Sequence, residues 1–105
     1  NDKQTAFGGS LYNASVMACW GMLYLKTLEA NITCNQVVTK GCIEYKAPVQ
    51  GDIRAICHAP DAAELEKMLK TFTQKGRARL TLFSSVECSG KKAVEFEGSY
   101  AILSE

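Results

Sequence analysis

Hydrophobic residues dominate one long segment near the start of the chain. From Ala14 to Leu25 only Ser15 and Gly21 interrupt a run of apolar positions. Such a run spans about 18 Å as a helix, short of the roughly 30 Å of a membrane's hydrocarbon core. Because it is apolar nearly all round, the pattern predicts a helix enclosed by other elements. Gly8-Gly9-Ser10 is expected to precede the helix and Ala30-Asn31 to end it.

Beyond this segment the period of hydrophobic positions changes from 3.6 to 2. Val37–Ala47 alternates between two faces, which predicts a half-buried strand. Pro48 and the cluster Gln50-Gly51-Asp52 break the pattern, and alternation resumes over Ile53–Ala59, which predicts a second strand. One face of the first strand is expected to carry Val37, Thr39, Gly41, Ile43 and Tyr45.

A short helix is predicted after the second strand. Asp61 can accept hydrogen bonds from the first-turn amides while Glu64 reaches back, as in a capping box. Gly76 is expected to end the helix after Lys75. An apolar stripe at helical spacing is expected to cover a sheet edge or rim, and it consists of Leu65, Met68, Leu69 and Phe72.

The last third of the chain predicts a β-hairpin that turns at Ser89-Gly90-Lys91-Lys92. Alternate residues from Ala78 to Cys88 share one face before the turn, and alternate residues from Val94 to Ile102 do so after it. One long helix, then four antiparallel strands with a short helix inserted after the second, makes an α+β domain. No linker or repeat is visible, so residues 1–105 are expected to form a single domain.

Composition narrows the classes of protein that remain. The 105 residues carry 12 Lys+Arg and 11 Asp+Glu, and this near-neutral balance argues against a general nucleic-acid binder. A hydrophobic content of 47% argues against disorder. The five cysteines and one histidine show no C-x-x-C pair or zinc-ligand spacing, so no metal site is expected. We interpret the cysteines as reduced, mostly core residues of a cytoplasmic protein.

Four separated motifs carry a resemblance to a known family, namely Asn1–Tyr12, Cys19–Leu25, Ile43–Val49 and Lys75–Arg79. In this order they resemble thioesterases of the hot-dog superfamily, most closely the branch also found C-terminal to acetyltransferase domains. The resemblance implies a long helix wrapped by an antiparallel sheet, and a homodimer or tetramer of dimers with a continuous double sheet. It also implies action on acyl thioesters of coenzyme A or acyl carrier protein, without a cofactor.

The start of the chain is unusual for that family. A complete hot-dog domain begins with a short helix and at least one strand before its Gly-Gly loop, whereas Gly8 and Gly9 stand almost at the beginning here. The resemblance therefore implies that an N-terminal helix and a first strand lie outside this chain.

Gly8-Gly9-Ser10 can support thioester chemistry. Two glycines allow close backbone approach, and the first amides of a helix are unpaired donors at the positive end of its dipole. Such donors can stabilise the oxyanion of a thioester, each contributing about 3–4 kcal/mol in acyl transfer. The alternative is a tight turn with no chemical role.

The candidates for activating water follow from the resemblance and from the residues themselves. Related enzymes carry His-Gly-Gly, an Asn six residues before the His and an acid nine residues after it. Here Asn1 stands at the Asn position, Phe7 replaces the His, and Val16 occupies the acid position. Asn1 or Asn13 is expected to orient a water molecule. Glu44 is the best candidate for activating it, across a dimer interface.

The remaining polar candidates each have a structural alternative. Ser15 could bind substrate, or could make a local helix bond. His58, alone on a polar strand face, is interpreted as a surface residue. Lys75, Arg77 and Arg79 could hold the coenzyme A phosphates, or could protect a sheet edge.

The sequence thus favours a cytoplasmic acyl-thioester hydrolase acting on acyl-CoA or acyl carrier protein. One alternative is a non-catalytic module that binds acyl thioesters, which the missing His and acid favour. Another is an accessory domain in fatty-acid metabolism. No nucleic-acid, membrane or metal partner is expected.

Overall fold

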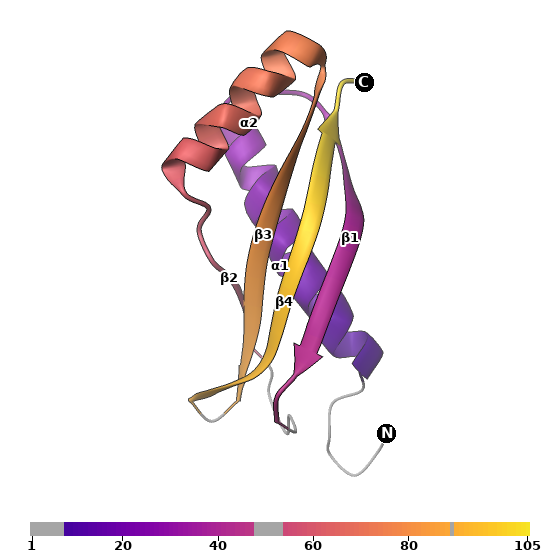
Figure 1. The fold of residues 1–105 in the computed structure, drawn as a ribbon, viewed down its shortest axis with the longest axis vertical. Helices are drawn as coiled ribbons and strands as arrows, with labels where there is room; N and C mark the ends of the chain where they lie inside the picture. Colours follow the sequence, from indigo (N-terminus) through magenta and orange to yellow (C-terminus); the bar gives the residue numbers. More distant parts are fainter. Residues whose placement is uncertain (1–7, 48–53, 89) are drawn as a thin grey trace.

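A computed structural model of the protein describes residues 8–47, 54–88 and 90–105. Figure 1 shows a sheet lying in front of α1, with α2 beside the upper part of β3. The predicted α+β class, a long helix against an antiparallel sheet, is confirmed. In chain order the elements are α1 (Gly8–Glu29), β1 (Asn35–Tyr45), β2 (Arg54–Cys57), α2 (Ala62–Lys75), β3 (Arg77–Cys88) and β4 (Lys91–Leu103).

The described sheet has the strand order β1-β4-β3-β2, and every neighbouring pair is antiparallel. The predicted hairpin of β3 and β4 pairs from Arg77 opposite Leu103 to Cys88 opposite Lys91, with a register shift between Val86 and Glu87. β1 pairs with the far side of β4, whereas β2 covers only residues 84–87 of β3. β4 is therefore an inner strand, although it is the last of the described strands in sequence order.

Alternation along the hairpin places its predicted apolar face against α1. Leu80 and Leu82 of β3 are buried, as are Phe96 and Tyr100 of β4. All four pack with Cys19 of α1 in one core cluster. We call this face of the sheet the inner face and the opposite one the outer face. The predicted alternation of the hairpin is confirmed.

The alternation predicted for β1 is wrong at one point, because a β-bulge interrupts it. The partners on β4 shift by one residue between Val38 and Lys40, so Thr39 is an extra residue. The inner face carries Val38 before the bulge and Ile43 after it. Val37 therefore lies on the outer face, whereas a regular strand would have placed it with Ile43.

One stripe of α1 is buried, and its members lie four residues apart: Leu11, Ser15, Cys19, Leu23 and Thr27. The opposite side is open to solvent, with 58% of Met17, 56% of Leu25 and 54% of Leu28 exposed. The prediction of an enclosed helix is therefore wrong within one chain. Hydrophobic residues all round a helix indicate that its surface is buried, but they do not show whether the same chain or a partner buries it. The helix ends as predicted, with Asn31 at a left-handed φ of 60°.

α2 packs on the same core beside β3 (Figure 1). Met68 is buried, and the rest of the predicted apolar stripe packs against the core cluster. Gly76 ends the helix at φ 75°, and its N–H donates to the Phe72 carbonyl oxygen at 2.7 Å, as predicted for a glycine C-cap. The predicted capping box is wrong, because Asp61 is the N-cap residue but its carboxylate makes no capping hydrogen bond.

Candidate functional site

The first two turns of α1 carry residues that we predicted to act on a carbonyl group. Gly8, Gly9 and Ser10 open the helix, so their N–H groups have no acceptor within it. The helix dipole adds partial positive charge at the same end. Asn13 follows in the second turn and is exposed. The structure thus brings these four residues to one end of α1, whereas Asn1 lies outside the described residues.

Ser15 has a structural role. Its hydroxyl donates to the carbonyl oxygen of Leu11 at 2.9 Å, and its side chain is fully buried. Its own carbonyl oxygen accepts a hydrogen bond from the Ser84 hydroxyl at 3.1 Å. These bonds fix α1 to the sheet, which is the local-bond alternative that the sequence left open.

Glu44 lies on the outer face of the sheet. Its neighbour Ile43 pairs with Phe96, whose ring packs edge-on against Tyr12 of α1, with centroids 5.6 Å apart. Since successive side chains of a strand point to opposite faces, Glu44 and its partner Glu95 face away from α1. Within one chain, the structure therefore does not bring Glu44 to the amides that open α1.

Glu44 helps to line an acidic hollow of about 270 Å³ on the outer face. Glu95 and Glu97 of β4 line it too, and Phe83 of β3, 50% exposed, adds an aromatic wall. Glu44 and Glu95 lie directly opposite each other, which is unfavourable for like charges. The Lys46 ammonium, 3.4 Å from the Glu95 carboxylate, reduces that repulsion.

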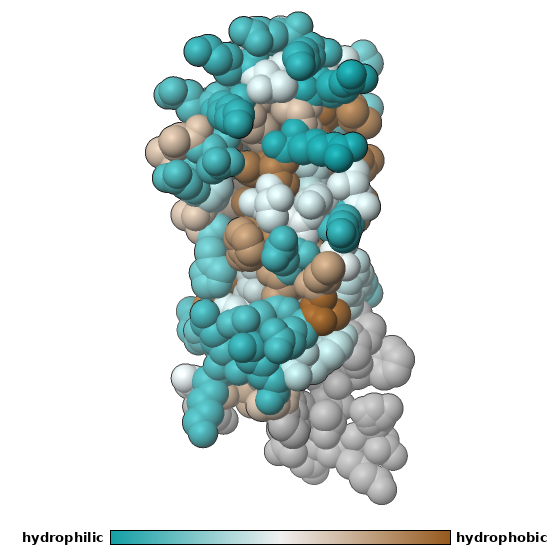
Figure 2. All heavy atoms as spheres, viewed as in Figure 1, coloured by the Kyte–Doolittle hydropathy of each residue, from teal (hydrophilic) through white to brown (hydrophobic). Residues whose placement is uncertain are grey.

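The three predicted phosphate-binding residues lie together at the upper end of the molecule in Figure 1. Lys75 ends α2, Gly76 turns the chain, and Arg77 and Arg79 follow on β3. Among the described residues, none of these three cations is in an ion pair. Figure 2 shows hydrophilic side chains over this end. The cations line a hollow of about 510 Å³ together with Val37, Thr39, Thr71, Ala78, Ala101 and Leu103.

The basic hollow and the start of α1 lie far apart in one chain. Leu11, in the first turn of α1, packs with Val86 and Val94 near the lower end of the hairpin. Val86 is seven residues from Arg79 along β3, or about 23 Å at a rise of about 3.3 Å per residue. α1 is also on the inner face, whereas Arg79 is on the outer face. One chain alone does not combine these two predicted parts of a site.

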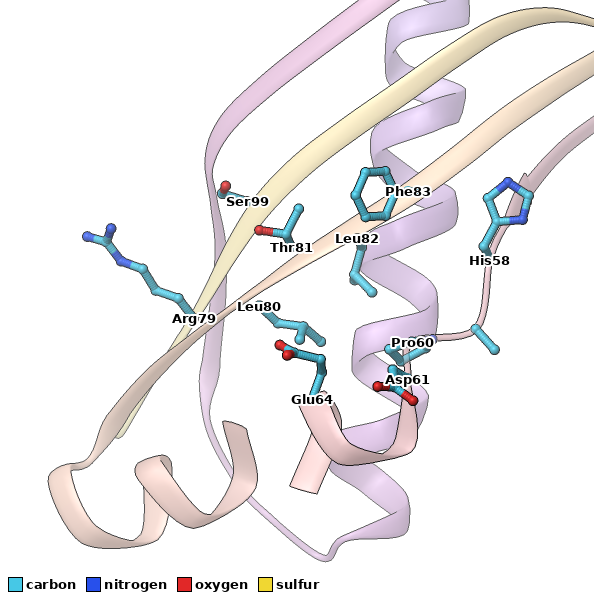
Figure 3. A pocket seen from close by; sticks show the side chains of 11 residues that line it. His58, Pro60, Asp61, Glu64, Arg79, Leu80, Thr81, Leu82, Phe83 and Ser99 are labelled. Carbon is cyan, nitrogen blue, oxygen red and sulfur yellow. The ribbon is translucent and has the colours of Figure 1, made fainter. Parts of the chain in front are cut away.

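A cavity of about 560 Å³ opens where β2 leaves the sheet. β2 ends at Cys57 and the chain turns away through Ala59-Pro60, so none of the described strands lies beside β3 from Arg79 to Thr81 on that side. Figure 3 shows Asp61 and Glu64, at the start of α2, across the cavity from the strand residues. Sequence reasoning missed this cavity. The only signal in the sequence was Pro60, which stops β2 from continuing along the rest of β3.

His58 lies at the rim of this cavity. Its backbone N–H donates to the Phe83 carbonyl oxygen at 2.9 Å, which extends the β2 pairing by one residue. Its ring Nε2 lies 3.5 Å from the Ser85 hydroxyl oxygen. His58 is exposed, as the sequence predicted, but it borders a cavity and not an open strand face.

Two kinds of site are missing from the part of the chain that the structure describes. No group of three or more His, Cys, Asp or Glu side chains there is arranged to hold a metal ion. No helix there is long and apolar enough to cross a membrane.

Comparison with known proteins assigns the chain to a family. The family model of YiiD_C, described as "Putative thioesterase (yiiD_Cterm)", matches residues 1–104. The protein belongs to the YiiD_C family. The family that the four motifs predicted, a thioesterase family, is thereby confirmed. The finer prediction of an acetyltransferase-linked branch stays a prediction.

Solved structures support the same fold for this YiiD_C protein. A Chlorobaculum tepidum protein of unknown function is 57% identical, with a TM-score of 0.97, over 100% of this chain and 70% of that one. A "putative thioesterase" from Shewanella oneidensis is 27% identical, with a TM-score of 0.81, over 96% of this chain and 66% of that one. A "probable thioesterase" from Pseudomonas aeruginosa is 20% identical, with a TM-score of 0.82, over 100% and 69%. The predicted hot-dog fold is confirmed.

Proposed function

We propose that this YiiD_C protein hydrolyses acyl thioesters carried by coenzyme A or acyl carrier protein. The observation that carries the proposal is the start of α1. There Gly8, Gly9 and Ser10 present backbone amides at a helix N-terminus, in a chain that belongs to a thioesterase family. Hydrolysis of a thioester passes through an oxyanion, and such amides are suited to stabilise one.

In the proposed reaction, water attacks the carbonyl carbon of the thioester and gives a proton to a base. The carbonyl oxygen becomes negative, and the amides of Gly8-Gly9-Ser10 stabilise it by about 3–4 kcal/mol each. The C–S bond then breaks, the thiolate takes up a proton, and a carboxylic acid and a thiol leave. Asn13, one turn along the exposed side of α1, is proposed to orient the water, with Asn1 as the alternative.

We expect a second copy of the chain to complete the site, because β1 is an edge of the described sheet. An antiparallel β1–β1 pair centred on Cys42 would place Lys40 of each copy opposite Glu44 of the other, on the same face. A shift of one residue would exchange the faces. Charge complementarity therefore favours this register, in a homodimer or a tetramer of dimers.

This register would also bring the two distant parts of the predicted site closer together. With Cys42 on the twofold axis, Val37 of one copy lies opposite Ala47 of the other. The basic hollow of the second copy would then be level with the start of α1 along the strands, with the hollow on the outer face and α1 on the inner face. Lys75, Arg77 and Arg79 of one copy are therefore proposed to hold the phosphates of a coenzyme A whose thioester lies at the other.

Glu44 has two proposed roles in the dimer, and each involves a different part of the second copy. As a base it would take the proton of the attacking water, acting on the site of a second copy. In the β1–β1 pair it would instead neutralise Lys40. Because it lies on the outer face in its own chain, the ion-pair role needs no further movement of the strand.

A second function, binding of acyl thioesters without turnover, is favoured by a specific observation. The position of the family histidine is Phe7, and Glu44 does not face the start of α1 within its chain. A module of this kind would serve as an accessory in fatty-acid metabolism. Either activity is proposed for the cytoplasm, where the five cysteines, none of them in a disulfide, would stay reduced.

The deciding experiment measures thiol release from a panel of acyl-CoA and acyl-carrier-protein substrates of different chain lengths. Hydrolysis that falls when Gly9 is replaced by proline, which removes one amide donor, would support the hydrolase. Tight acyl-CoA binding with no thiol release from any member of the panel would reject the hydrolase in favour of the binding module.

A further inference from the structure

The edge of β3 that faces away from β4 is covered by β2 over only part of its length. β2 pairs with residues 84–87 of β3, and the His58 N–H extends this pairing by donating to the Phe83 carbonyl oxygen at 2.9 Å. None of the described strands continues beside Thr81 and Arg79. β3 therefore has an open length of edge, and the proposed hydrolysis uses none of its backbone groups.

The direction of these backbone groups follows from the strand pairing. In an antiparallel ladder, alternate residues direct both N–H and C=O to the same neighbouring strand. Phe83 directs its carbonyl oxygen to the β2 side, so Thr81 and Arg79 direct their N–H and C=O groups to that side as well. Leu80, between them, directs its groups to Tyr100 on β4. No described residue bonds to the two N–H and two C=O groups at the open edge.

The cavity of about 560 Å³ lies against this open edge. Strand residues from Arg79 to Phe83 form one wall, and residues from His58 to Asp61, together with Glu64, form the other. Ligand sites in proteins commonly have volumes of about 300–1,000 Å³. An open strand edge can bind an extended peptide, which adds a strand to the sheet. The cavity thus provides space beside the groups to which such a peptide bonds.

The wall opposite the strand carries two exposed carboxylates. Asp61 is the N-cap residue of α2, and Glu64 lies in its first turn. Glu64 precedes Met68 by one turn, and Met68 packs with Leu80 in the core, so Glu64 is on the inner-face side of the edge. Among the ion pairs of the described residues, none involves either carboxylate. Figure 3 shows the Arg79 guanidinium pointing away from both, so this wall favours a basic ligand.

We propose that the open edge of β3 binds an extended segment of a partner protein that carries a lysine or arginine. The segment lies antiparallel to β3, in line with β2, and exchanges N–H···O bonds with Thr81 and Arg79. Its basic residue lies opposite Leu80 and points to the inner-face side, toward Asp61 and Glu64. Main-chain bonds supply affinity, and the two carboxylates supply selectivity. The proposal does not rest on the proposed hydrolase activity.

The first test measures binding of a fluorescent, N-acetylated peptide, Thr-Val-Thr-Lys-Thr-Val-Thr, to the whole chain by fluorescence anisotropy. We expect saturable binding that weakens roughly tenfold or more when the peptide's lysine is replaced by glutamate. Methylation of the backbone nitrogens of both threonines next to the lysine should abolish binding, because it removes the donors to the Thr81 and Arg79 carbonyl oxygens. The matched control is methylation of the lysine backbone nitrogen, which faces away from β3 and should leave binding unchanged.

A charge exchange tests the acidic wall. Glu64→Lys should lose binding of the lysine peptide and should instead bind the glutamate peptide. Glu66→Lys is the matched control, since Glu66 is exposed on the same helix but does not line the cavity. Both positions are exposed, so both variants are expected to fold. Equal effects of the two variants would assign binding to net charge alone and would overturn the proposal.

Amide hydrogen exchange, followed by NMR, tests the register. The amides of Thr81 and Arg79 should exchange fast in the free protein and at least roughly tenfold more slowly with saturating peptide. The Leu80 amide, directed to β4, should exchange slowly in both states. Absence of saturable binding, or unchanged exchange at Thr81 and Arg79, would overturn the proposal. Slow exchange at both amides in the free protein would also overturn it, because another segment or a second copy would already cover the edge.

Discussion

Gly41 of β1 lies directly opposite Gly98 of β4, and aromatic rings occupy the space that their missing side chains leave. A Cβ atom at Gly41 would lie 2.5 Å from the Tyr12 hydroxyl oxygen and 3.0 Å from the Phe96 ring. One at Gly98 would lie 2.7 Å from Phe96 and 2.8 Å from Tyr100. The glycine pair therefore lets these rings cover the inner face of the sheet where α1 crosses it.

Replacement of Gly98 by alanine should lower the free energy of unfolding by about 1–3 kcal/mol, because two rings must move. Gly21→Ala is the matched control, since a Cβ there meets no atom within 4 Å and alanine favours a helix interior by about 1 kcal/mol. Urea unfolding of both variants measures the difference. Equal stability of Gly98→Ala and the natural protein would show that the ring packing is not tight.

The free energy of unfolding should depend on pH through the thiols of Cys19 and Cys57. The pKa of Cys19 is about 7 in the folded protein against an ordinary 9.0, so the unfolded chain binds more protons between these values. The free energy of unfolding should therefore rise by about 1–2 kcal/mol from pH 7 to pH 9. Above pH 9 it should fall, because folding raises the pKa of Cys57 and of Tyr100.

This pH dependence can be measured by urea unfolding with a reductant present. Cys19→Ala should be less stable at every pH and should lose the rise between pH 7 and pH 9. The groups that face Cys19 are Cys57, Ser84 and Tyr100, so no carboxylate is expected to contribute in this range. An equal rise in Cys19→Ala would assign the effect to other groups.

The β1–β1 contact makes a charge-exchange prediction. Lys40→Glu should weaken the dimer roughly tenfold, because it places two pairs of like charges opposite each other. Adding Glu44→Lys should restore the dimer, since the pairs then have opposite signs again. Sedimentation equilibrium measures both. Mild oxidation should also join the two Cys42 residues across the twofold axis by a disulfide. If neither the charge exchange nor this cross-link behaves as expected, the register is rejected.

Glu44→Gln separates the two proposed roles of that residue. Loss of hydrolysis by 100-fold or more in a dimer of unchanged affinity would mark Glu44 as the base. A weaker dimer with an unchanged rate per dimer would mark it as the ion-pair partner of Lys40. The rate is measured at saturating acyl-CoA and the association by sedimentation, on the same preparation.

The basic hollow predicts a selective effect on substrate binding. Arg77→Ala and Arg79→Ala should each raise KM for acyl-CoA roughly fivefold to tenfold and leave kcat unchanged, because the phosphates bind far from the reacting carbon. KM for acyl-pantetheine, which has no phosphate, should not change. Lys91→Ala, an exposed cation at the hairpin turn, is the control. A similar KM increase for both substrates would show that the phosphates bind elsewhere on the protein.

Part of this structure could be predicted from the local pattern of residues in the sequence. The faces of β3 and β4 follow from alternation, because side-chain direction along a strand has a period of two. Gly76 predicted the end of α2, since only glycine adopts φ 75° without strain. The family resemblance supplied the hot-dog fold, which periodicity alone would have left as one of several α+β arrangements.

The remaining features depend on contacts between segments that lie far apart in the sequence, which no local pattern shows. The bulge at Thr39 is set by β4, some 60 residues later in the chain. The exposed side of α1 is also largely apolar, with Met17, Leu25 and Leu28, so the sequence could not tell which side the sheet covers. The position of Glu44 on the outer face follows from the register at Ile43, and the cavity beside His58 depends on where β2 leaves the sheet.

The inner position of β4 has a consequence for the order of folding during synthesis. β1 and β3 are neighbours of β4 and not of each other, so β1 has no partner in the described sheet until residues 91–103 have emerged from the ribosome. Until then Val37 and Val38 form part of an unpaired apolar strand, and α1 has little sheet to rest on. Emergence of β4, not synthesis of β1 or β3, is therefore the step at which the described sheet can assemble.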